Sequence, residues 1–313
     1  MSCAPCRCSG ELRTAILSAA QEAGACAAGF ARVEPVEPRY VEAYRRWIER
    51  GMNGGMEYLD RYHDVRENPA LLLEGARSML CVAFPYRNGS MPRHPLFADY
   101  ALGIDYHEVL RHALEPVARL MRESVAGSET RICVDTAPIR ERYWAAKAGL
   151  GFIGLNNQII IPGIGSAVFL AEILWTVSVA PSDSRLEECC IKCGKCVRAC
   201  PSGALQTDGT LDARRCLSYL TIEHRGELPE ELSLVGRRIY GCDVCRDVCP
   251  YNSPNEMPVR EEFKPSEELM KLTVADICRM EQPDFSRIFR HSAVKRAKLA
   301  GLLRNAEAAK QDS

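Results

Sequence analysis

Two short bursts of cysteine constrain this chain more than any other feature of its sequence. Eight of its 16 cysteines lie in these bursts, between Cys189 and Cys249. Disulfide scaffolds are usually short, secreted chains with evenly spread cysteines. This chain has 313 residues and does not begin with an apolar run of signal-peptide length. The bursts therefore indicate metal ligands rather than disulfides.

The first burst has the spacing C-x2-C-x2-C-x3-C-P, in which three cysteines hold one [4Fe–4S] cluster and the fourth reaches a second cluster. The second burst repeats the last three cysteines of this pattern, but Ile239 occupies the expected leading position. Cys216 lies between the bursts as the nearest spare cysteine, and we assign it as the replacement. The fourth ligands are crossed as in bacterial two-cluster ferredoxins. The first cluster then takes Cys190, Cys193, Cys196 and Cys249, and the second takes Cys200, Cys216, Cys242 and Cys245.

The alternative to iron–sulfur clusters is a pair of structural zinc sites, because C-x2-C pairs also bind zinc. Zinc knuckles normally arrive as two separated pairs, whereas the first burst is a triplet followed by C-P. The spacing therefore favours two clusters, and it leaves Cys189 without a role. Cysteines in apolar settings are expected to be small core residues, and those near the N-terminus are weaker metal candidates. The first group is Cys26, Cys81, Cys133 and Cys278, and the second is Cys3, Cys6 and Cys8.

The residue pattern predicts an α+β domain over residues 1–180. Residues 181–257 form the expected two-cluster ferredoxin-like domain, and residues 258–313 a basic helical segment. Helices are expected at Glu11–Ala28, Val41–Arg50, His107–Glu123, Ile139–Ala148 and Ser292–Ala308. Strands are expected at Ser78–Phe84, Ile132–Val134 and Ala167–Val179.

Composition adds two limits. The chain is 47% hydrophobic and 26% charged, which is typical of globular proteins. Its net charge is -1, so an acidic partner needs a local basic patch. No stretch approaches the roughly 18 apolar residues of a membrane span. We therefore expect a soluble, cytoplasmic protein, and a monomer.

Two clusters form a path for single electrons, and such a path needs an acceptor. The sequence has no G-x-G-x-x-G loop for a nicotinamide cofactor and no G-x-x-x-x-G-K-[ST] loop for ATP. Gly149–Gly154 (GLGFIG) is rich in glycine but follows an expected helix. We interpret it as a turn or a close approach of two backbones.

At this point the residues resemble the epoxyqueuosine reductase family, the cobalamin-dependent iron–sulfur enzymes of the last step of queuosine synthesis in tRNA. The resemblance covers most of the chain and includes the unusual placement of Cys216. It rests on the segments AGFARVEP, RENPALLLEGARS, GIDYH, VDTAPIRERYWAAKAGLGFIG, GSAVFLAEI, LDARRCLSYLTIE, IYGCDVCRDVCP and SAVKRAKLAGLLRN.

The resemblance implies a nitroreductase-like α+β domain that binds cobalamin base-off beside the two-cluster domain. An external low-potential donor would send electrons through the clusters to make Co(I), which suits attack on the epoxide of the modified base. A proton must then reach the epoxide oxygen, and the family's donor is the aspartate of V-D-T-[AG], which is Asp135 here. A buried carboxyl over an apolar cofactor face is expected to have a raised pKa. The alternative role for Asp135 is to cap the helix expected from Ile139.

The resemblance also assigns contacts to cobalamin and to tRNA. Residues matched to cobalamin contacts are Arg66, Ala98, Asp135, Ile159, Leu170, Arg215, Ser218, Cys242 and Asp243. Ile159 and Leu170 would equally suit a strand core, and Arg66 a solvated surface. Residues 285–305 carry six Lys or Arg and no carboxylate, which suits phosphates, although a basic helix is often only a solvated face. Residues matched to tRNA contacts are Arg225, Lys295, Arg296, Lys298 and Arg304. A flipped-out anticodon base could enter a pocket over the cofactor.

Two features depart from the family, and three alternatives stay open. Many members have a helical repeat module that helps to hold tRNA, and none is expected here. The G-K-N often found after the glycine turn is Gly154, Leu155 and Asn156 in this chain. One alternative is a reductive dehalogenase-like cobalamin enzyme, although these usually carry a twin-arginine export signal and a tyrosine proton donor. The others are a cofactor-free ferredoxin-type electron carrier and a zinc-stapled RNA-binding module.

Overall fold

A four-stranded antiparallel sheet forms the centre of the N-terminal part of the protein. The computed structural model describes residues 9–188, 190–229, 238–252 and 256–311. The strands lie in the order β1 (Ala27–Arg32), β2 (Ser78–Pro85), β6 (Val168–Trp175) and β3 (Thr130–Cys133). Strands β2 and β6 pair along their whole length, with Ser78 opposite Trp175 and Pro85 opposite Val168. The two central strands are apolar almost throughout because both faces of the sheet are covered.

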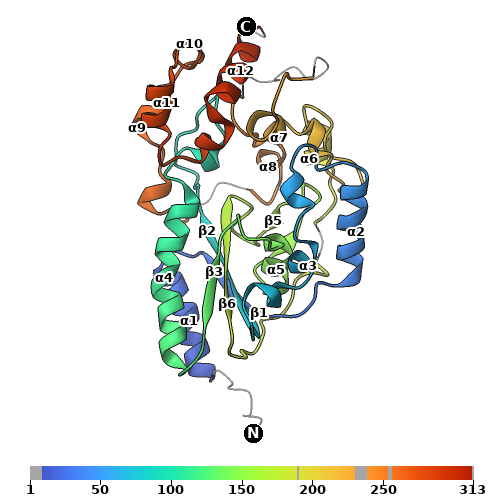
Figure 1. Ribbon diagram of the computed structural model, residues 1–313, viewed down its shortest axis with the longest axis vertical. Helices are drawn as coiled ribbons and strands as arrows, with labels where there is room; N and C mark the ends of the chain where they lie inside the picture. Colours follow the sequence, from blue (N-terminus) through green and yellow to red (C-terminus); the bar gives the residue numbers. More distant parts are fainter. Residues whose placement is uncertain (1–8, 189, 230–237, 253–255, 312–313) are drawn as a thin grey trace.

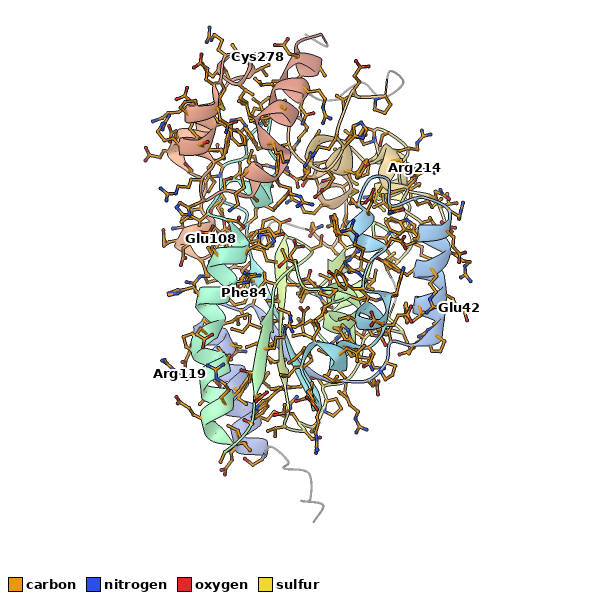
Figure 2. The ribbon with its side chains drawn as sticks, in the orientation of Figure 1. Glu42, Phe84, Glu108, Arg119, Arg214 and Cys278 are labelled. Atoms are coloured by element: carbon orange, nitrogen blue, oxygen red, sulfur yellow. The ribbon has the colours of Figure 1, made fainter. Side chains whose placement is uncertain are left out.

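Helices cover the two faces of the sheet, and each face has its own core. Helices α1 (Gly10–Glu22) and α4 (Tyr106–Ser124) pack on one face, where Phe84 and Trp175 are fully buried (Figure 2). Helix α5 (Glu141–Lys147) packs on the other face and buries Trp144 against it. Because successive strand residues point to opposite faces, each central strand contributes to both cores.

Shorter elements complete this part of the protein. Helices α2 (Pro38–Glu49) and α3 (His63–Glu67) lie beside the sheet (Figure 1), and β4 (Phe152–Ile153) pairs with β5 (Ile159–Ile160). The turn Gly149–Gly154 joins α5 to β4. Gly149 has a positive φ of 82°, and a Cβ on Gly151 would lie 2.1 Å from the carbonyl oxygen of Ile160. The interpretation of GLGFIG as a turn with a close backbone approach is therefore confirmed.

The cysteine-bearing helices and the C-terminal helices lie beyond one end of the sheet (Figure 1). The first group is α6 (Lys195–Ala199), α7 (Leu217–Ile222) and α8 (Val244–Asp247). The second group is α9 (Glu267–Met270), α10 (Val274–Cys278), α11 (Gln282–Ile288) and α12 (Lys298–Gln311). Single 3-10 turns also occur at Glu57–Leu59, Pro69–Leu72, Asp99–Ala101, Ala213–Arg215, Glu261–Phe263 and Ala293–Ala297.

A shared core ties these parts together. Phe97, in the segment before α4, packs in one cluster with Tyr240 and with Phe289 and Leu302 of the C-terminal helices. A Cβ on Gly241 would lie 2.6 Å from the Cβ of Ala98, so only glycine permits this contact. The division at residues 180 and 257 stays a prediction, because packing continues across both positions.

The expected α+β fold is confirmed, and the differences are local. Helix α1 ends at Glu22, six residues before the end of the span expected to be helical over 11–28, and strand β1 begins at Ala27 within that span. The expected helix Ser292–Ala308 is interrupted at Lys298, whose φ of 60° breaks the helical path between a 3-10 turn and α12. Among the described residues, no helix is long and apolar enough to cross a membrane.

Candidate iron–sulfur and active site

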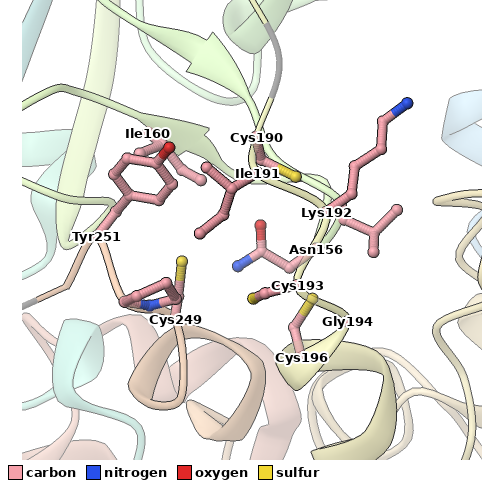
Figure 3. A pocket seen from close by; sticks show the side chains of 12 residues that line it. Asn156, Ile160, Cys190, Ile191, Lys192, Cys193, Gly194, Cys196, Cys249 and Tyr251 are labelled. Carbon is pink, nitrogen blue, oxygen red and sulfur yellow. The ribbon is translucent and has the colours of Figure 1, made fainter.

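The four cysteines of the first predicted set surround one hollow. Cys190, Cys193, Cys196 and Cys249 all line it, together with Asn156 and Tyr251 (Figure 3). Three of these cysteines come from the first burst and the fourth from the end of the second, as the crossed assignment requires. Asn156, at the position where the family often has asparagine after lysine, donates a hydrogen bond to the carbonyl oxygen of Cys245, at 3.3 Å. The hollow therefore has the ligand set predicted for the first cluster.

The second predicted set also gathers in one place. Burial, together with the nearby Cys216 thiol, raises the pKa of the Cys242 thiol to about 11 and that of Cys245 to about 12. Cys200 and Cys196 also act on Cys245, so the two ligand sets are neighbours. Cys216 precedes the first residue of α7, which directs it toward the second burst.

The arrangement of the thiols distinguishes a site for a [4Fe–4S] cluster from a site for a single zinc ion. A zinc ion draws four ligand atoms to within about 2.3 Å of one point. Four thiols that line an open hollow suit a [4Fe–4S] cluster, which is larger than a single ion. The geometry favours [4Fe–4S] clusters over structural zinc.

Buried ion pairs fix α8, which carries Cys245, against the segment before α4. The guanidinium of Arg246 is 3% exposed and lies 2.6 Å from Asp99 and 3.4 Å from Asp243. Asp243 in turn accepts the backbone N–H of Asp99 at 2.9 Å and a bond from Arg238 at 3.1 Å. Buried charges persist only when they are paired in this way. This network holds the second ligand set against the α+β part.

Asp135 stands at the turn between β3 and α5. Its φ of 48° is rare for a residue with a side chain. The carboxylate lies 2.9 Å from Nε2 of His107, and the Asp135 backbone N–H donates to Oε1 of Glu141 at 2.7 Å. Helix α5 begins at Glu141 with Arg140 as its N-cap, so the capping role considered for Asp135 is wrong. The Asp135 side chain is 50% exposed.

His107 links Asp135 to a second carboxylate. Its Nδ1 lies 2.7 Å from Asp105, whose other oxygen lies 2.8 Å from Nζ of Lys295. Burial opposes the charged imidazole, but hydrogen bonds to Asp105 and Asp135 raise the pKa of His107 to about 9. At neutral pH the imidazolium therefore holds the Asp135 carboxylate in a fixed direction and keeps a proton beside it.

The His107 contacts predict a pH-dependent stability. Because the pKa of His107 is raised from 6.5 to about 9, its stabilisation is complete below about pH 6.5 and is lost as the pH rises through about 9. The contribution is at most about 3 kcal/mol, from about 1.4 kcal/mol per unit. The difference in thermal midpoint between the wild type and His107→Gln should therefore shrink between pH 6.5 and 9, under anaerobic conditions. An unchanged difference across this range would contradict the assignment.

The residues matched to cobalamin contacts fall into two groups. Ile159 and Leu170 share the core cluster under α5. Gly241, which precedes Cys242 and Asp243, lies against Ala98, and Asp243 accepts the backbone N–H of Asp99, while Arg215 and Ser218 flank Cys216 in the sequence. Arg66 is not simply solvated, because its guanidinium donates to the carbonyl oxygens of Tyr58 and Arg61. The roles of these residues stay predictions.

The residues matched to tRNA contacts differ in how they are used. Lys298 is exposed at the start of α12. Lys295 pairs with Asp105, and Arg296 forms a two-bond pair with Glu223 at 2.9 and 2.8 Å. Arg225, also exposed, donates to the carbonyl oxygen of Arg296 at 3.0 Å.

Arg304 requires a correction. Its guanidinium donates to the carbonyl oxygens of Leu220, His224 and Gly226, at 2.7, 3.0 and 2.8 Å. It also donates to Asn305, which is itself fully buried. These bonds occupy the donors of Arg304 on the end of α7 and the turn after it, so we assign it to structure rather than to RNA.

Three residues of the site were not identified from the sequence. His107 lies in the motif GIDYH, where its spacing from Asp135 gives no sign of contact. Glu141 follows Asp135 by six residues, which only the turn brings back to it. Tyr58 is 41% exposed, and the guanidinium of Arg296 lies 5.6 Å from its ring centre. The only feature of the sequence that could have indicated Tyr58 is an aromatic residue directly after a glycine-rich segment.

Known protein families match both the cysteine-bearing region and the segment that ends at the Asp135 turn. Residues 189–252 match the model of a 4Fe-4S double cluster binding domain, and residues 66–136 match the model described as Epoxyqueuosine reductase QueG, DUF1730. An epoxyqueuosine reductase of Gloeobacter violaceus is 36% identical over 304 residues, covering 94% of each chain. That of Leadbetterella byssophila is 37% identical over 267 residues, covering 83% of this chain and 86% of the relative.

This chain belongs to the epoxyqueuosine reductase family. Its members are oxidoreductases, which excludes the electron carrier without chemistry of its own and the zinc-stapled RNA-binding module. The family relative of Escherichia coli is 36% identical, and this chain spans 70% of its length.

Solved structures of the epoxyqueuosine reductase family share the fold. One, in complex with an epoxyqueuosine-modified tRNA-Tyr stem loop, superimposes with a TM-score of 0.87 at 31% identity and covers 96% of this chain and 80% of its own. Another, from Bacillus subtilis with its catalytic aspartate loop swung out of the active site, gives a TM-score of 0.86 at 30% identity and covers 96% and 81%. These matches confirm the α+β fold with a two-cluster domain.

Proposed function

We propose that this protein reduces epoxyqueuosine to queuosine in tRNA, with Asp135 as the proton donor. The observation that carries the proposal is the contact of Asp135 with His107 on an exposed turn, in a chain that also gathers the cysteines of the first predicted set around one hollow. The family relatives support the substrate, and a relative of the same fold binds a modified stem loop.

The chain's residues fit a bound cobalamin. Cobalamin has an apolar ring face with amide groups and a phosphate at its edge, and the proposed contacts combine apolar Ile159 and Leu170 with hydrogen-bonding Arg66 and Ser218. Arg66 has five N–H donors, and the structure uses two of its nitrogen atoms on carbonyl groups, so donors remain for an amide. When bound, cobalamin supplies a reducible, strongly nucleophilic cobalt centre.

We propose that the second cluster is the last electron carrier before cobalamin. Its ligands Cys216 and Cys242 are adjacent in sequence to the proposed cofactor contacts Arg215 and Asp243. Electrons from an external low-potential donor would enter at the first cluster, whose ligand Cys193 is exposed. We propose that the protein acts as a monomer.

Asp135 and His107 together supply a proton to the substrate in the proposed reaction. Asp135 gives a proton to the epoxide oxygen as its carbon–oxygen bond breaks. The protonated His107 orients the carboxyl group through Nε2 and is itself fixed by Asp105. The positive φ of Asp135 places the group on the exposed side of the turn, where a substrate can reach it.

The proposed tRNA surface lies beside this turn. Exposed Lys298 and Arg225 offer charge to phosphates, and Tyr58 offers a ring on which an unpaired base can stack. Arg296 is paired with Glu223 and lies over the Tyr58 ring, so it fixes the ring as well as adding charge.

The experiment that tests the function is anaerobic. Cluster-reconstituted protein, a low-potential reductant and tRNA with epoxyqueuosine are incubated with and without cobalamin, and the nucleosides are analysed by mass spectrometry. We expect the modified nucleoside to lose one oxygen only when cobalamin is present. An epoxide that survives with both clusters and cobalamin bound would contradict the proposed substrate.

Lys298 gives a direct test of the tRNA surface. Lys298→Ala should weaken stem-loop binding several-fold and lower the slope of log K against log salt by about 0.7 to 0.9, because one phosphate contact is lost. Fluorescence anisotropy at several salt concentrations measures both. The matched control is Lys271→Ala, an equally exposed lysine after α9, which should leave affinity and slope unchanged. Equal effects of the two variants would contradict the proposed surface.

A further inference from the structure

The proposed reaction needs two protons, and a single carboxyl group such as that of Asp135 can deliver only one at a time. Converting an epoxide to an alkene breaks both carbon–oxygen bonds, forms a carbon–carbon double bond and releases the oxygen as water. This change consumes two electrons and two protons. The two electrons come from the external donor. A second proton must therefore reach the substrate oxygen while the substrate covers the exposed side of Asp135.

A buried acid lies in the central sheet and interacts with the charge of Asp135. Glu172 is at the centre of β6 and has no exposed surface. It is paired in register with Cys81 on β2 and Cys133 on β3, so its side chain points to the α5 face. Neither of its carboxyl oxygens has a hydrogen-bond partner among the described residues. A bare buried carboxylate is strongly disfavoured, so Glu172 holds a proton.

Glu141 contacts Asp135 and also acts on the buried Glu172. It occupies the first turn of α5, and its Oε1 accepts the backbone N–H of Asp135 at 2.7 Å. Burial, and then the charge of Asp135, raise the pKa of Glu141 to about 7. Burial, and then the charges of Glu141 and Asp135, raise the pKa of Glu172 well above its ordinary value. The charges of Glu141 and Asp135 both act on Glu172, so the three carboxyl groups are neighbours.

None of the other described titratable groups around Glu141 and Glu172 is a better proton donor at neutral pH. The neutral thiols of Cys81 and Cys133 face Glu172 from the adjacent strands, and burial raises the pKa of both. The charges that act on Glu141 are those of Asp135, Arg142 and His107. His107 also touches Asp135, but its pKa of about 9 makes it a weaker acid at neutral pH than Glu141. Proton transfer is fastest from an acid whose pKa is near the working pH.

We propose that Glu141 and Glu172 form an internal proton store, in which Glu141 returns a proton to Asp135 after the first has gone to the substrate oxygen. Glu172 then restores the proton of Glu141. The inference rests on the proposed function. It assigns Glu141 and Glu172 as positioning residues for protons, because neither touches the substrate.

Kinetics of the holoenzyme test the role of Glu141. In single turnovers with epoxyqueuosine tRNA, Glu141→Gln should slow product formation at least tenfold and remove the dependence on a group with a pKa of about 7. Affinities for cobalamin and stem loop should stay unchanged, since glutamine keeps the acceptor for the Asp135 N–H. Glu74→Gln, on an exposed loop, is the matched control and should behave as the wild type. An unchanged rate and pH profile in Glu141→Gln would overturn the inference.

Infrared spectroscopy of the resting holoprotein tests whether Glu141 and Glu172 hold protons before any substrate is converted. The holoprotein should show carboxylic acid carbonyl bands that shift in deuterated water: one that titrates near pH 7 and is lost in Glu141→Gln, and one that persists to higher pH and is lost in Glu172→Gln. Absence of both bands from the wild type overturns the store even if the enzyme is active. A wild type that leaves the epoxide intact overturns the proposed function itself, whereas an active wild type with an unaffected Glu141→Gln variant overturns the store alone.

Discussion

Replacing Asp135 by asparagine should abolish most of the epoxide reduction while both clusters and cobalamin remain bound. Asparagine keeps an oxygen that can accept from Nε2 of His107, at the position of the 2.9 Å contact, so the turn should keep its shape. It has no acidic proton, and loss of a general acid lowers rates by about 10² to 10⁴. The single-turnover rate of nucleoside conversion, followed by mass spectrometry, measures the loss.

The control for this variant is a second exposed aspartate far from the turn. Asp183→Asn, in the segment that follows β6, should convert the substrate at the wild-type rate. The absorbance of cobalamin and the iron content should be the same in all three proteins. A less than tenfold loss in Asp135→Asn with normal cofactor content would assign the proton to another group.

Replacing Cys216 by serine should remove the second cluster and leave the first. Iron–sulfur clusters are held by thiolates, and a serine hydroxyl is a poor substitute. Iron and acid-labile sulfide should fall from about eight to about four atoms each per chain. The ligands of the first cluster line a separate hollow, so its low-temperature electron paramagnetic resonance signal should persist. Conversion of the tRNA should stop, because the electron path is broken before the cofactor.

Cys26→Ser is the matched control for the cluster experiment. The Cys26 thiol donates to the carbonyl oxygen of Ala83 at 3.2 Å, a bond that a serine hydroxyl can also make. This variant should therefore keep all the iron and the activity. Full iron content in Cys216→Ser would show that Cys216 is not a ligand, and the assignment of the displaced cysteine would fail.

The sequence predicted the cluster ligands because their chemistry depends on local spacing. A C-x2-C-x2-C triplet can close around one corner of a cluster whatever the rest of the chain does. Helix α4 and the central strands β2 and β6 were also predicted, since their apolar patterns are long and unambiguous. Strand β1 was missed because its short, alanine-rich segment becomes a strand only through pairing with β2.

Charge along the sequence did not separate RNA contacts from structural contacts. Arg304 and Lys298 stand in one basic run, yet Arg304 is occupied by carbonyl groups near residues 220–226, about 80 positions earlier. Only the tertiary structure brings those acceptors to it. Lys298 remains a candidate because its position at the start of α12 leaves it exposed.

The sequence by itself determined the main elements of the sheet, and it predicted the two ligand sets and, through its resemblance, the aspartate at the centre of the proposed chemistry. The tertiary structure decided what surrounds that aspartate. His107 precedes Asp135 by 28 positions, and Glu172 follows it by 37. They approach it only because α4 and β6 pack around the turn after β3. Their protonation depends on burial and on neighbouring charges, which are properties of packing and not of local sequence.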